Sequence, residues 1–257
     1  MISKNRLKYI RSLERKKHRK ESGAFVVEGP KTVSDMLYSF RCRYVGATKE
    51  WLDKNSGRLA ADVEVDELTL EELSRASFQE HPQQVIAVFD IPSYHYDPTI
   101  PERQLVLALD EIQNPGNLGT IIRIADWFGI SDIICSEGTA DIYNPKTVQS
   151  AMGSMSRVKV HYVDLAEMLK SLPSSCPVYG TFLDGENVYG SSLQDHGVIV
   201  MGNEGNGISD DILPFITHKL TIPNFNTAET QADSLNVAVA TAVICSEFKR
   251  RDIAALK

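Results

Sequence analysis

The segment of the chain best suited to chemistry runs from Asn114 to Arg123 and reads Asn-Pro-Gly-Asn-Leu-Gly-Thr-Ile-Ile-Arg. It follows an apolar run typical of a strand and opens a helix. A strand-to-helix turn with two glycines exposes backbone N–H groups and a helix N-terminus, which suits an anionic group. Arg123 follows Asn117 by six residues, so on a straight helix its long side chain can reach the same ligand. Taken alone, Pro-Gly-Asn is equally typical of a plain turn.

A second segment, residues 197–209, has three glycines within six residues after a strand-like run, Gly-Val-Ile-Val-Met. Because glycine has no Cβ, the backbone there can approach a flat or charged ligand. The order Gly-x-x-Gly-x-Gly differs from the dinucleotide fingerprint, and no Lys-Ser or Lys-Thr follows, so neither NAD nor ATP is favoured. Glu204 lies inside this loop, where its carboxylate would repel a phosphate but can orient a neighbouring side chain.

A third segment begins with the strand-like Leu-Thr-Ile before Pro223 and reaches Ser234, Leu235 and Asn236 at the start of the last predicted helix. Ser234 and Asn236 occupy positions at which side chains cap a helix, and capping is their purely structural interpretation. Two polar residues on either side of Leu235 can also line a pocket.

The net charge of -7 conceals an asymmetry between the start of the chain and the rest. Residues 1–20 contain nine Lys or Arg and one Glu, a local charge of +8, so the remaining residues carry -15. Leu7, Ile10 and Leu13 recur at helical spacing after Ser3, a candidate N-cap. We therefore predict a basic helix over Lys4–Lys20, which either contacts a phosphate backbone or is only a solvated helix face.

Length and composition limit the class of protein. With 257 residues, 42% hydrophobic and 24% charged, the chain is long enough for one large or two ordinary domains, and disorder and collagen-like repeats are excluded. No run approaches the ~18 uninterrupted apolar residues of a membrane helix, and the N-terminus lacks an apolar export core. We expect a soluble cytoplasmic protein without a membrane partner. The four cysteines are widely spaced, which predicts buried thiols rather than disulfides, and no clustered His/Cys motif predicts a metal.

These segments must be positioned by two α/β domains joined by a proline-rich linker. In the first domain, over residues 1–95, we predict strands at 25–28, 44–47 and 85–89, and helices through Val33–Leu37 and Leu68–Leu73. The linker, residues 91–103, contains three prolines and suits neither a helix interior nor a central strand.

In the second domain, residues 104–257, we predict a strand at 105–109 and a helix at 117–128 that Gly129 closes in the left-handed conformation. Continuous apolar runs predict further strands at 133–135, 158–162, 178–182, 198–201 and 219–222, in a parallel sheet covered on both faces. A last helix is predicted over 234–250. We expect its core face to carry Leu235, Val239, Ala242 and Val243.

Taken together, the three segments resemble the signature motifs of the SpoU, or TrmH-like, RNA ribose methyltransferases of the SPOUT superfamily. The matching patterns are Asn-x-Gly-x-x-x-Arg, Met-Gly-Asn-Glu-Gly-x-Gly-Ile, and Ile-Pro followed by Ser-Leu-Asn-Val, in that order. The resemblance covers about residues 104–250 and includes Asn144-Pro145-Lys146 and Ser150-Ala151-Met152-Gly153. Residues 5–29 look like the ribosomal-protein L30e-like substrate-binding domain that often precedes these enzymes.

The resemblance implies a C-terminal SPOUT domain with a deep trefoil knot, in which a parallel sheet is flanked by helices and S-adenosyl-L-methionine is bound. It implies a homodimer that acts on RNA, without a metal. Gly202, Ile222 and Leu235 would give backbone contacts to the cofactor, and Met201, Asn203 and Gly205 would shape its loop. The implied catalytic residues are Arg123, Asn117, Glu204, Ser234 and Asn236.

Arg123 is the residue that the family uses at the ribose 2′-hydroxyl. A guanidinium stays protonated, with a pKa above about 12, so it is a poor general base. We expect Arg123 to hold the adjacent phosphate and the developing alkoxide while the phosphate or a water takes the proton. Glu204 and Asn117 would orient Arg123, and Ser234 and Asn236 would complete the pocket.

Other functions remain open at this level. The separate front domain favours ribosomal RNA, and a tRNA ribose methyltransferase is the alternative within the same enzyme class. A non-catalytic RNA-binding module is a second alternative, although such a scaffold has little need for all five catalytic residues. A nucleotide- or NAD-dependent oxidoreductase is disfavoured by the glycine order.

Overall fold

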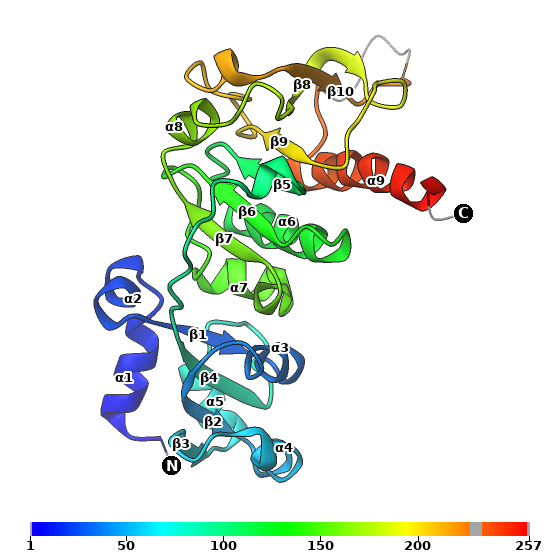
Figure 1. The fold of residues 1–257 in the computed structure, drawn as a ribbon. Helices are drawn as coiled ribbons and strands as arrows, with labels where there is room; N and C mark the ends of the chain where they lie inside the picture. Colours follow the sequence, from blue (N-terminus) through cyan, green and yellow to red (C-terminus); the bar gives the residue numbers. More distant parts are fainter. Residues whose placement is uncertain (1, 227–232, 256–257) are drawn as a thin grey trace. The chain divides into compact units, whose positions relative to one another are not determined.

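The computed structural model describes residues 2–226 and 233–255, with side chains described as far as residue 250 (Figure 1). The chain forms two compact units. The first contains Met1–Ser93 and Asp141–Arg157, and the second contains Tyr94–Ala140 and Val158–Lys257. The segment 141–157 therefore folds with the first unit, although in sequence it lies within the range that we assigned to the second domain.

The first unit is built on a four-stranded sheet in the order β1-β4-β2-β3. Its strands are β1 (Ala24–Glu28), β2 (Cys42–Ala47), β3 (Glu64–Glu67) and β4 (Val85–Asp90). β4 is antiparallel to β1 and β2, whereas β2 and β3 are parallel. The edge strand β1 and its neighbour β4 are buried except at their last residues, so these two strands contribute much of the core. We did not predict β3, because its residues are largely exposed and show no apolar pattern.

Helices surround this sheet. They are α1 (Lys4–Ser12), α2 (Lys16–Ser22), α3 (Pro30–Met36), α4 (Lys49–Asn55), α5 (Leu70–Ala76) and α7 (Pro145–Ala151), with short 3-10 turns η1 (Ser56–Arg58) and η3 (Ser154–Ser156). Ser3 caps α1 as predicted, since its hydroxyl accepts from the Arg6 N–H at 3.1 Å.

The prediction of a single basic helix over Lys4–Lys20 is wrong. The helix stops near Leu13, and a second one starts after Arg15. The guanidinium of Arg19 donates to the carbonyl oxygens of Leu13 and Glu14 at 2.8 and 2.7 Å. These two carbonyls are thereby satisfied outside a helix, which stabilises the break.

The segment 141–157 is attached to the first unit by specific contacts. Arg19 and Asp141 form an ion pair at 2.6 Å, and both side chains are largely buried. The ring of Tyr143 lies 4.7 Å from that of Phe25, measured between centroids. Neither contact was visible in the sequence, because the partners are more than a hundred residues apart.

The second unit contains a six-stranded, fully parallel sheet in the order β10-β8-β9-β5-β6-β7. Its strands are β5 (Leu105–Leu109), β6 (Asp132–Cys135), β7 (Lys159–Tyr162), β8 (Val178–Asn187), β9 (Gly197–Met201) and β10 (His218–Thr221). All residues of β5, β6 and β9 are buried, so the sheet is covered on both faces. The prediction of a parallel sheet with covered faces is confirmed.

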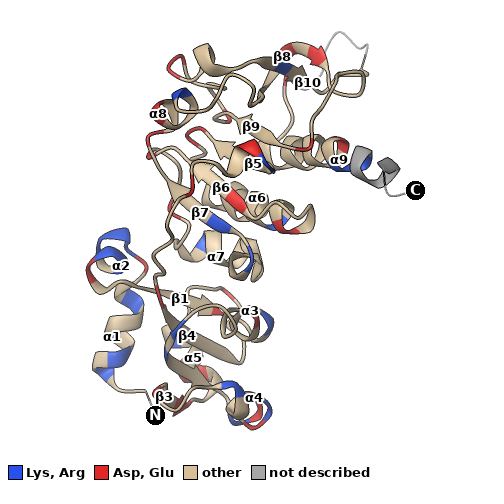
Figure 2. Cartoon of the chain, in the orientation of Figure 1, with Lys and Arg blue, Asp and Glu red and all other residues tan. Residues whose placement is uncertain are grey.

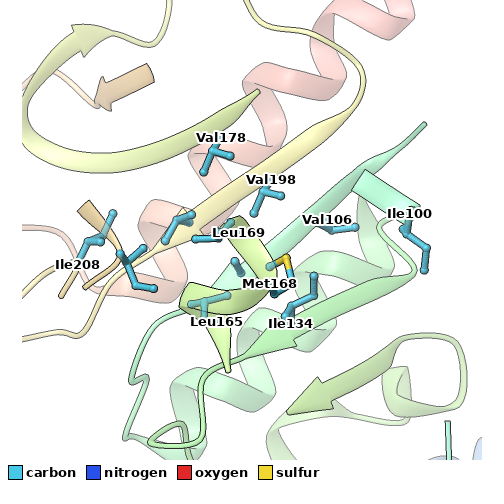
Figure 3. Close-up of a cluster of buried hydrophobic side chains, with 12 residues drawn as sticks. Ile100, Val106, Ile134, Leu165, Met168, Leu169, Val178, Val198 and Ile208 are labelled. Carbon is cyan, nitrogen blue, oxygen red and sulfur yellow. The ribbon is translucent and has the colours of Figure 1, made fainter. Parts of the chain in front are cut away.

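The helices of this unit are α6 (Pro115–Trp127), α8 (Leu165–Lys170) and α9 (Val237–Ala255), with 3-10 turns η2 (Ile100–Glu102) and η4 (Leu213–Phe215). α6 and α9 pack against each other (Figure 1). Leu165, Met168 and Leu169 of α8 lie against strand residues such as Val106 and Val198 in one apolar cluster (Figure 3). As predicted, Gly129 follows α6 with a left-handed φ of +68°.

The predicted core face of α9 is wrong at Leu235 and Val239, whereas Ala242 and Val243 are partly buried. The buried positions are Val237, Ala238, Thr241, Ile244, Cys245, Glu247 and Phe248. Leu235 and Val239 are instead 50% and 51% exposed. The helix begins at Val237 rather than at Ser234. Leu235 therefore precedes the helix and cannot share a helix face with the apolar residues after it.

Two further sequence predictions concern cysteines and membranes. All four cysteines, Cys42, Cys135, Cys176 and Cys245, are buried and free, as predicted. Within the described part of the chain, no helix combines the length and the apolar character needed to cross a membrane.

Candidate active site

The three segments singled out in the sequence meet at the side chain of Asn117, in the first turn of α6. Its Nδ2 donates to Oε1 of Glu204 at 2.8 Å. Its Oδ1 accepts from Nδ2 of Asn236 at 3.1 Å. One hydrogen-bonded chain, Asn236–Asn117–Glu204, therefore joins the helix after β5, the glycine loop after β9 and the start of α9.

The local sequence fixes the position of Asn117. Asn114 caps α6, because its Oδ1 accepts from the N–H groups of Gly116 at 2.8 Å and Asn117 at 3.4 Å. Pro115 occupies the first helical turn, where a missing N–H carries no penalty. The Pro-Gly-Asn turn is thus the N-terminus of a helix that projects a side-chain amide toward the glycine loop.

Asn203 organises the glycine loop. Its backbone N–H and C=O pair with those of Gly207 at 2.9 and 3.0 Å, and its Oδ1 accepts from the N–H groups of Gly205 and Asn206 at 2.9 and 3.1 Å. Its Nδ2 donates to the carbonyl oxygen of Glu111 at 2.7 Å, which fastens the loop to the end of β5. Glu204 is held at the tip of a well-defined turn.

Gly202 is required by this loop for an internal reason. A Cβ at Gly202 would lie 2.3 Å from the carbonyl carbon of Gly207, closer than any side chain tolerates. We had attributed the glycines to the approach of a ligand, but at this position the loop's own backbone comes too close. Gly207 has a φ of +73°, which also favours glycine.

Arg123 lies on α6, exposed to solvent. It forms no hydrogen bond or ion pair with any described residue, so it is not bonded to Asn117 or Glu204 as we had expected. Its guanidinium is available to a ligand. Ser234 is exposed, and its hydroxyl likewise forms no hydrogen bond with a described residue.

Asn236 combines both interpretations that the sequence left open. Its Oδ1 accepts from the N–H of Ala238 at 3.0 Å and so caps α9. The same side chain uses its amide nitrogen to bond Asn117. The cap therefore fixes the orientation of a residue that also belongs to the site.

The basic helices α1 and α2 carry most of the cationic side chains at the start of the chain (Figure 2). Arg19 belongs to the predicted basic run, but it is only 2% exposed and paired with Asp141, so its charge is not presented at the surface. Arg6 pairs with Glu64, and Arg11 donates to the backbone oxygen of Ser77. The cations that stay exposed are Lys4, Lys8, Arg11, Arg15, Lys16, Lys17 and Lys20.

Comparison with known proteins gives two matches to family models. Residues 104–246 match the SpoU rRNA methylase family, and residues 4–87 match the MRM3-like substrate binding domain. A relative from Bacillus subtilis, 23S rRNA (guanosine(2553)-2'-O)-methyltransferase RlmP, is 34% identical, with 93% of this chain and 94% of the relative covered.

Solved structures agree with these matches. A TrmH-family protein from Porphyromonas gingivalis is 41% identical with a TM-score of 0.87, covering 98% of this chain and 99% of that one. An S-adenosylmethionine-bound rRNA methyltransferase from Sinorhizobium meliloti is 27% identical with a TM-score of 0.83, covering 98% and 97%.

The chain belongs to the SpoU rRNA methylase family. The resemblance drawn from the three segments is confirmed, and with it the prediction of an RNA ribose methyltransferase that uses S-adenosylmethionine. Among the described side chains, no three His, Cys, Asp or Glu residues gather closely enough to hold a metal ion.

A stretch of the sheet beside these segments was not singled out in the sequence. β8 lies between β9 and β10 in the sheet, so the residues after Gly180 lie between the loop at Gly202 and Ile222. Here the pairing of β8 with β10 jumps from Gly180 to Glu186, and residues 181–185 form a bulge. Thr181 donates to the Val200 oxygen at 3.1 Å, and Leu183 is 76% exposed. This stretch has no motif-like residues, and only the strand order reveals its place.

Proposed function

We propose that this SpoU-family chain transfers the methyl group of S-adenosylmethionine to a ribose 2′-hydroxyl of ribosomal RNA. The observation that carries the proposal is the hydrogen-bonded chain Asn236–Asn117–Glu204, which joins the three family segments at one point. Ribosomal RNA is preferred over tRNA because the relatives named above act on rRNA.

The residues assigned to the cofactor fit a ligand that is recognised through main-chain groups. The backbone N–H and C=O groups of Gly202, Ile222 and Leu235 form no hydrogen bond with any residue that the structure describes. Gly202 and Ile222 are partly buried, and unpaired backbone groups in such positions need a partner. Met201, Asn203 and Gly205 would shape the adjoining loop, and the 181–185 bulge would form the wall between Gly202 and Ile222.

S-adenosylmethionine supplies a methyl group on a positively charged sulfur, and the protein must align the ribose oxygen with it. In our proposal the free guanidinium of Arg123 binds the neighbouring phosphate and the negative charge that develops on the oxygen. Proton transfer goes to that phosphate or to a water. Correct alignment can lower the barrier by as much as about 7–11 kcal/mol.

The other polar residues hold the substrate. Glu204 is fixed by Asn117 and Asn117 by Asn236, so the three side chains present a rigid polar surface to the ribose. The hydroxyl of Ser234 would complete the pocket. We also propose that Glu204 orients Arg123 once RNA is bound.

We extend the proposal to the domains. Family membership supports a deep trefoil knot in the domain over residues 104–257 and an L30e-like RNA-binding domain over residues 1–95, with a linker at 91–103. It also supports a location in the cytoplasm. The exposed cations of α1 and α2 would contact phosphates of the RNA.

Homodimer formation is part of the same proposal. Trp127 on α6 is 85% exposed, and Leu235 and Val239 beside and on α9 are half exposed. α6 and α9 pack together, so these apolar side chains belong to one helical pair and are left uncovered by the described part of the chain. Large exposed apolar groups of this kind are typical of protein–protein interfaces.

The test is incubation of the protein with labelled S-adenosylmethionine and separated rRNA and tRNA fractions. We expect label in rRNA, in dinucleotides that resist alkaline hydrolysis, because a methylated 2′-oxygen cannot attack the adjacent phosphate. An Arg123→Ala variant is the matched control. Label in tRNA alone, or on a base, would overturn the proposal.

A further inference from the structure

A cavity of about 350 Å³ lies within the first unit, which does not contain the methyl-transfer site. It is bounded by Val26 and Glu28 of β1, by Phe78 and Gln79 after α5, by Glu14 between α1 and α2, and by residues 144–149 before and within α7. A cavity of this size is large enough for one small planar ligand.

Glu28 is the unusual group in the cavity wall. Its carboxylate accepts from the backbone N–H of Phe78 at 2.8 Å and from the hydroxyl of Ser77. Burial raises the pKa of Glu28, and these two hydrogen bonds and the nearby positive charge of Arg11 oppose that rise. No described cation forms an ion pair with it. Since an ionised carboxylate can accept about four hydrogen bonds, two positions are left for a donor.

The rest of the wall suits a flat, partly polar ring. Val26 and Val148 give apolar surface, and Gln79 and Gln149 carry amides. The guanidinium of Arg11 lies over the ring of Phe78, 5.0 Å from its centroid. Lys146 is exposed and pairs with no described acidic group, so its ammonium is free to meet a phosphate. Unpaired RNA bases are bound by this combination of ring contact, edge hydrogen bonds and a nearby cation.

We propose that this cavity binds one unpaired guanine of the RNA substrate, with the guanine N1–H and 2-amino group donating to Glu28. Only guanine presents two adjacent N–H donors on its Watson–Crick edge. In adenine and cytosine a ring nitrogen that accepts hydrogen bonds is next to the amino group, and in uracil two carbonyls flank the single N–H. With any of these bases, an acceptor atom would face an acceptor oxygen of Glu28. Lys146 neutralises the phosphate of the same nucleotide.

The inference rests on the proposed function in one respect, namely that RNA is the substrate. It gives the first unit a role in selecting sequence, beyond the charge attraction of its basic helices. A good two-bond contact to a base edge discriminates by about tenfold or more, which is enough to select among otherwise similar loops.

The experiment uses the full chain without cofactor and labelled pentaribonucleotides, uridine throughout except for guanosine, inosine, adenosine or uridine at the centre. We expect guanosine to bind about tenfold more tightly than adenosine or uridine. Inosine lacks only the 2-amino group, so it should fall between. Equal affinities for guanosine and adenosine would overturn the proposal, and this comparison needs no variant to fold.

Variants then locate the contact. Glu28→Gln should abolish the preference for guanosine over inosine, because one acceptor oxygen becomes a donor. Glu71→Gln, an exposed position on α5 with the same change in charge, should keep the preference. Lys146→Ala should weaken the binding of all four oligonucleotides by the same factor. A guanosine preference that survives Glu28→Gln would show that the base binds elsewhere.

Methylation is measured separately on rRNA, so the two proposals fail in different ways. Guanosine preference without methyl transfer to rRNA would contradict the proposed function and leave the cavity assignment standing. Methyl transfer to a ribose without guanosine preference would contradict the cavity assignment alone.

Discussion

The side-chain nitrogen of Asn117 lies 2.8 Å from Oε1 of Glu204, although 87 residues separate them in the chain. This bond joins the first turn of α6 to the tip of the glycine loop after β9. Asn236 bonds the opposite end of the same amide at 3.1 Å. Because both ends are occupied, the orientation of the Asn117 amide is fixed, and a change at this residue must disturb both neighbouring segments.

Asn117→Asp tests this relationship. The change retains shape but sets a second carboxylate against Glu204, and two such groups at hydrogen-bond distance cannot both ionise. We expect kcat/KM for methylation to fall by about tenfold or more near pH 8, and to recover partly near pH 6, where the pair shares a proton. Asn117→Ala removes the bonds without adding charge, so it should lose activity with no such recovery. Parallel pH profiles for the two variants would argue against the arrangement.

Arg123→Lys tests the role of the free guanidinium. Lysine keeps the charge but loses the planar fork that binds a phosphate oxygen and an alkoxide together. The expected result is a methylation rate lower by roughly tenfold or more, with little change in cofactor affinity. Rates come from single turnovers and affinity from calorimetry with S-adenosylmethionine. A near-normal rate in Arg123→Lys would remove Arg123 from the proposed chemistry.

Features that depend on local sequence were predicted well. Continuous apolar runs such as Leu105–Leu109 predict buried strands, because a strand covered on both faces has no polar side. Ser3 and Gly129 were correctly expected to begin and end helices, since capping depends on neighbouring residues only. The site motifs were visible for the same reason, each being a short run at one end of a strand.

Features that depend on distant partners were not predictable. The attachment of residues 141–157 to the first unit depends on the bond between Asp141 and Arg19, which lie 122 residues apart in the chain. The β8 bulge became visible only from the strand order. The wrong face of α9 has a different cause. Apolar residues occur on both sides of that helix, so composition alone cannot tell the buried side from one left exposed, as at Val239.

The exposed cations of α1 and α2 predict how RNA affinity depends on salt. Each phosphate contact contributes about 0.7 to the slope of log affinity against log salt for single-stranded RNA. The double variant Arg15→Ala/Lys16→Ala should therefore flatten the slope by about 1.4. Fluorescence titration of an rRNA fragment at several salt concentrations measures it. An unchanged slope would mean that these side chains are only a solvated surface.

Arg19→Ala is the matched control for that experiment. Arg19 is buried against Asp141, so its loss should leave the salt slope unaltered. It removes one partner of a buried ion pair, which costs about 3 kcal/mol in the free energy of unfolding. Urea unfolding measures this loss. A flatter slope in Arg19→Ala with normal stability would contradict the buried position.

Val239→Asp tests the proposed dimer. Val239 is 51% exposed in the first turn of α9, where a carboxylate is compatible with the helix N-terminus. The folded chain should therefore tolerate the change, while an apolar interface would not. We expect sedimentation to show a dimer for the unmodified chain and a monomer for the variant, with little change in circular dichroism. A variant that remains dimeric would place the interface elsewhere.

Glu28→Gln should show how much the buried carboxylate lowers the free energy of unfolding. Burial raises the pKa of Glu28 above its ordinary value of 4.5, so the folded chain holds this proton more tightly than the unfolded chain does. Stability therefore declines as pH rises through the raised pKa. The amide mimics the protonated acid, so Glu28→Gln should be more stable than the unmodified chain near pH 7. The difference in the free energy of unfolding between the variant and the unmodified chain should shrink below about pH 4.5. Urea unfolding at both pH values measures it.

Glu72→Gln should show the opposite sign. Glu72 accepts from the Thr69 N–H at 3.0 Å and from the Ile2 N–H at 3.1 Å, and these bonds, chiefly the one from Thr69, lower its pKa below 4.5. A lowered pKa contributes stability above the unfolded value, which is lost as pH falls through the folded one. Glu72→Gln should thus be less stable near pH 7, and the difference should vanish in acid. If the free energies of unfolding of the two variants, relative to the unmodified chain, change with pH in the same direction, burial does not determine the pKa of Glu28. That result would contradict an unsatisfied acceptor in the cavity.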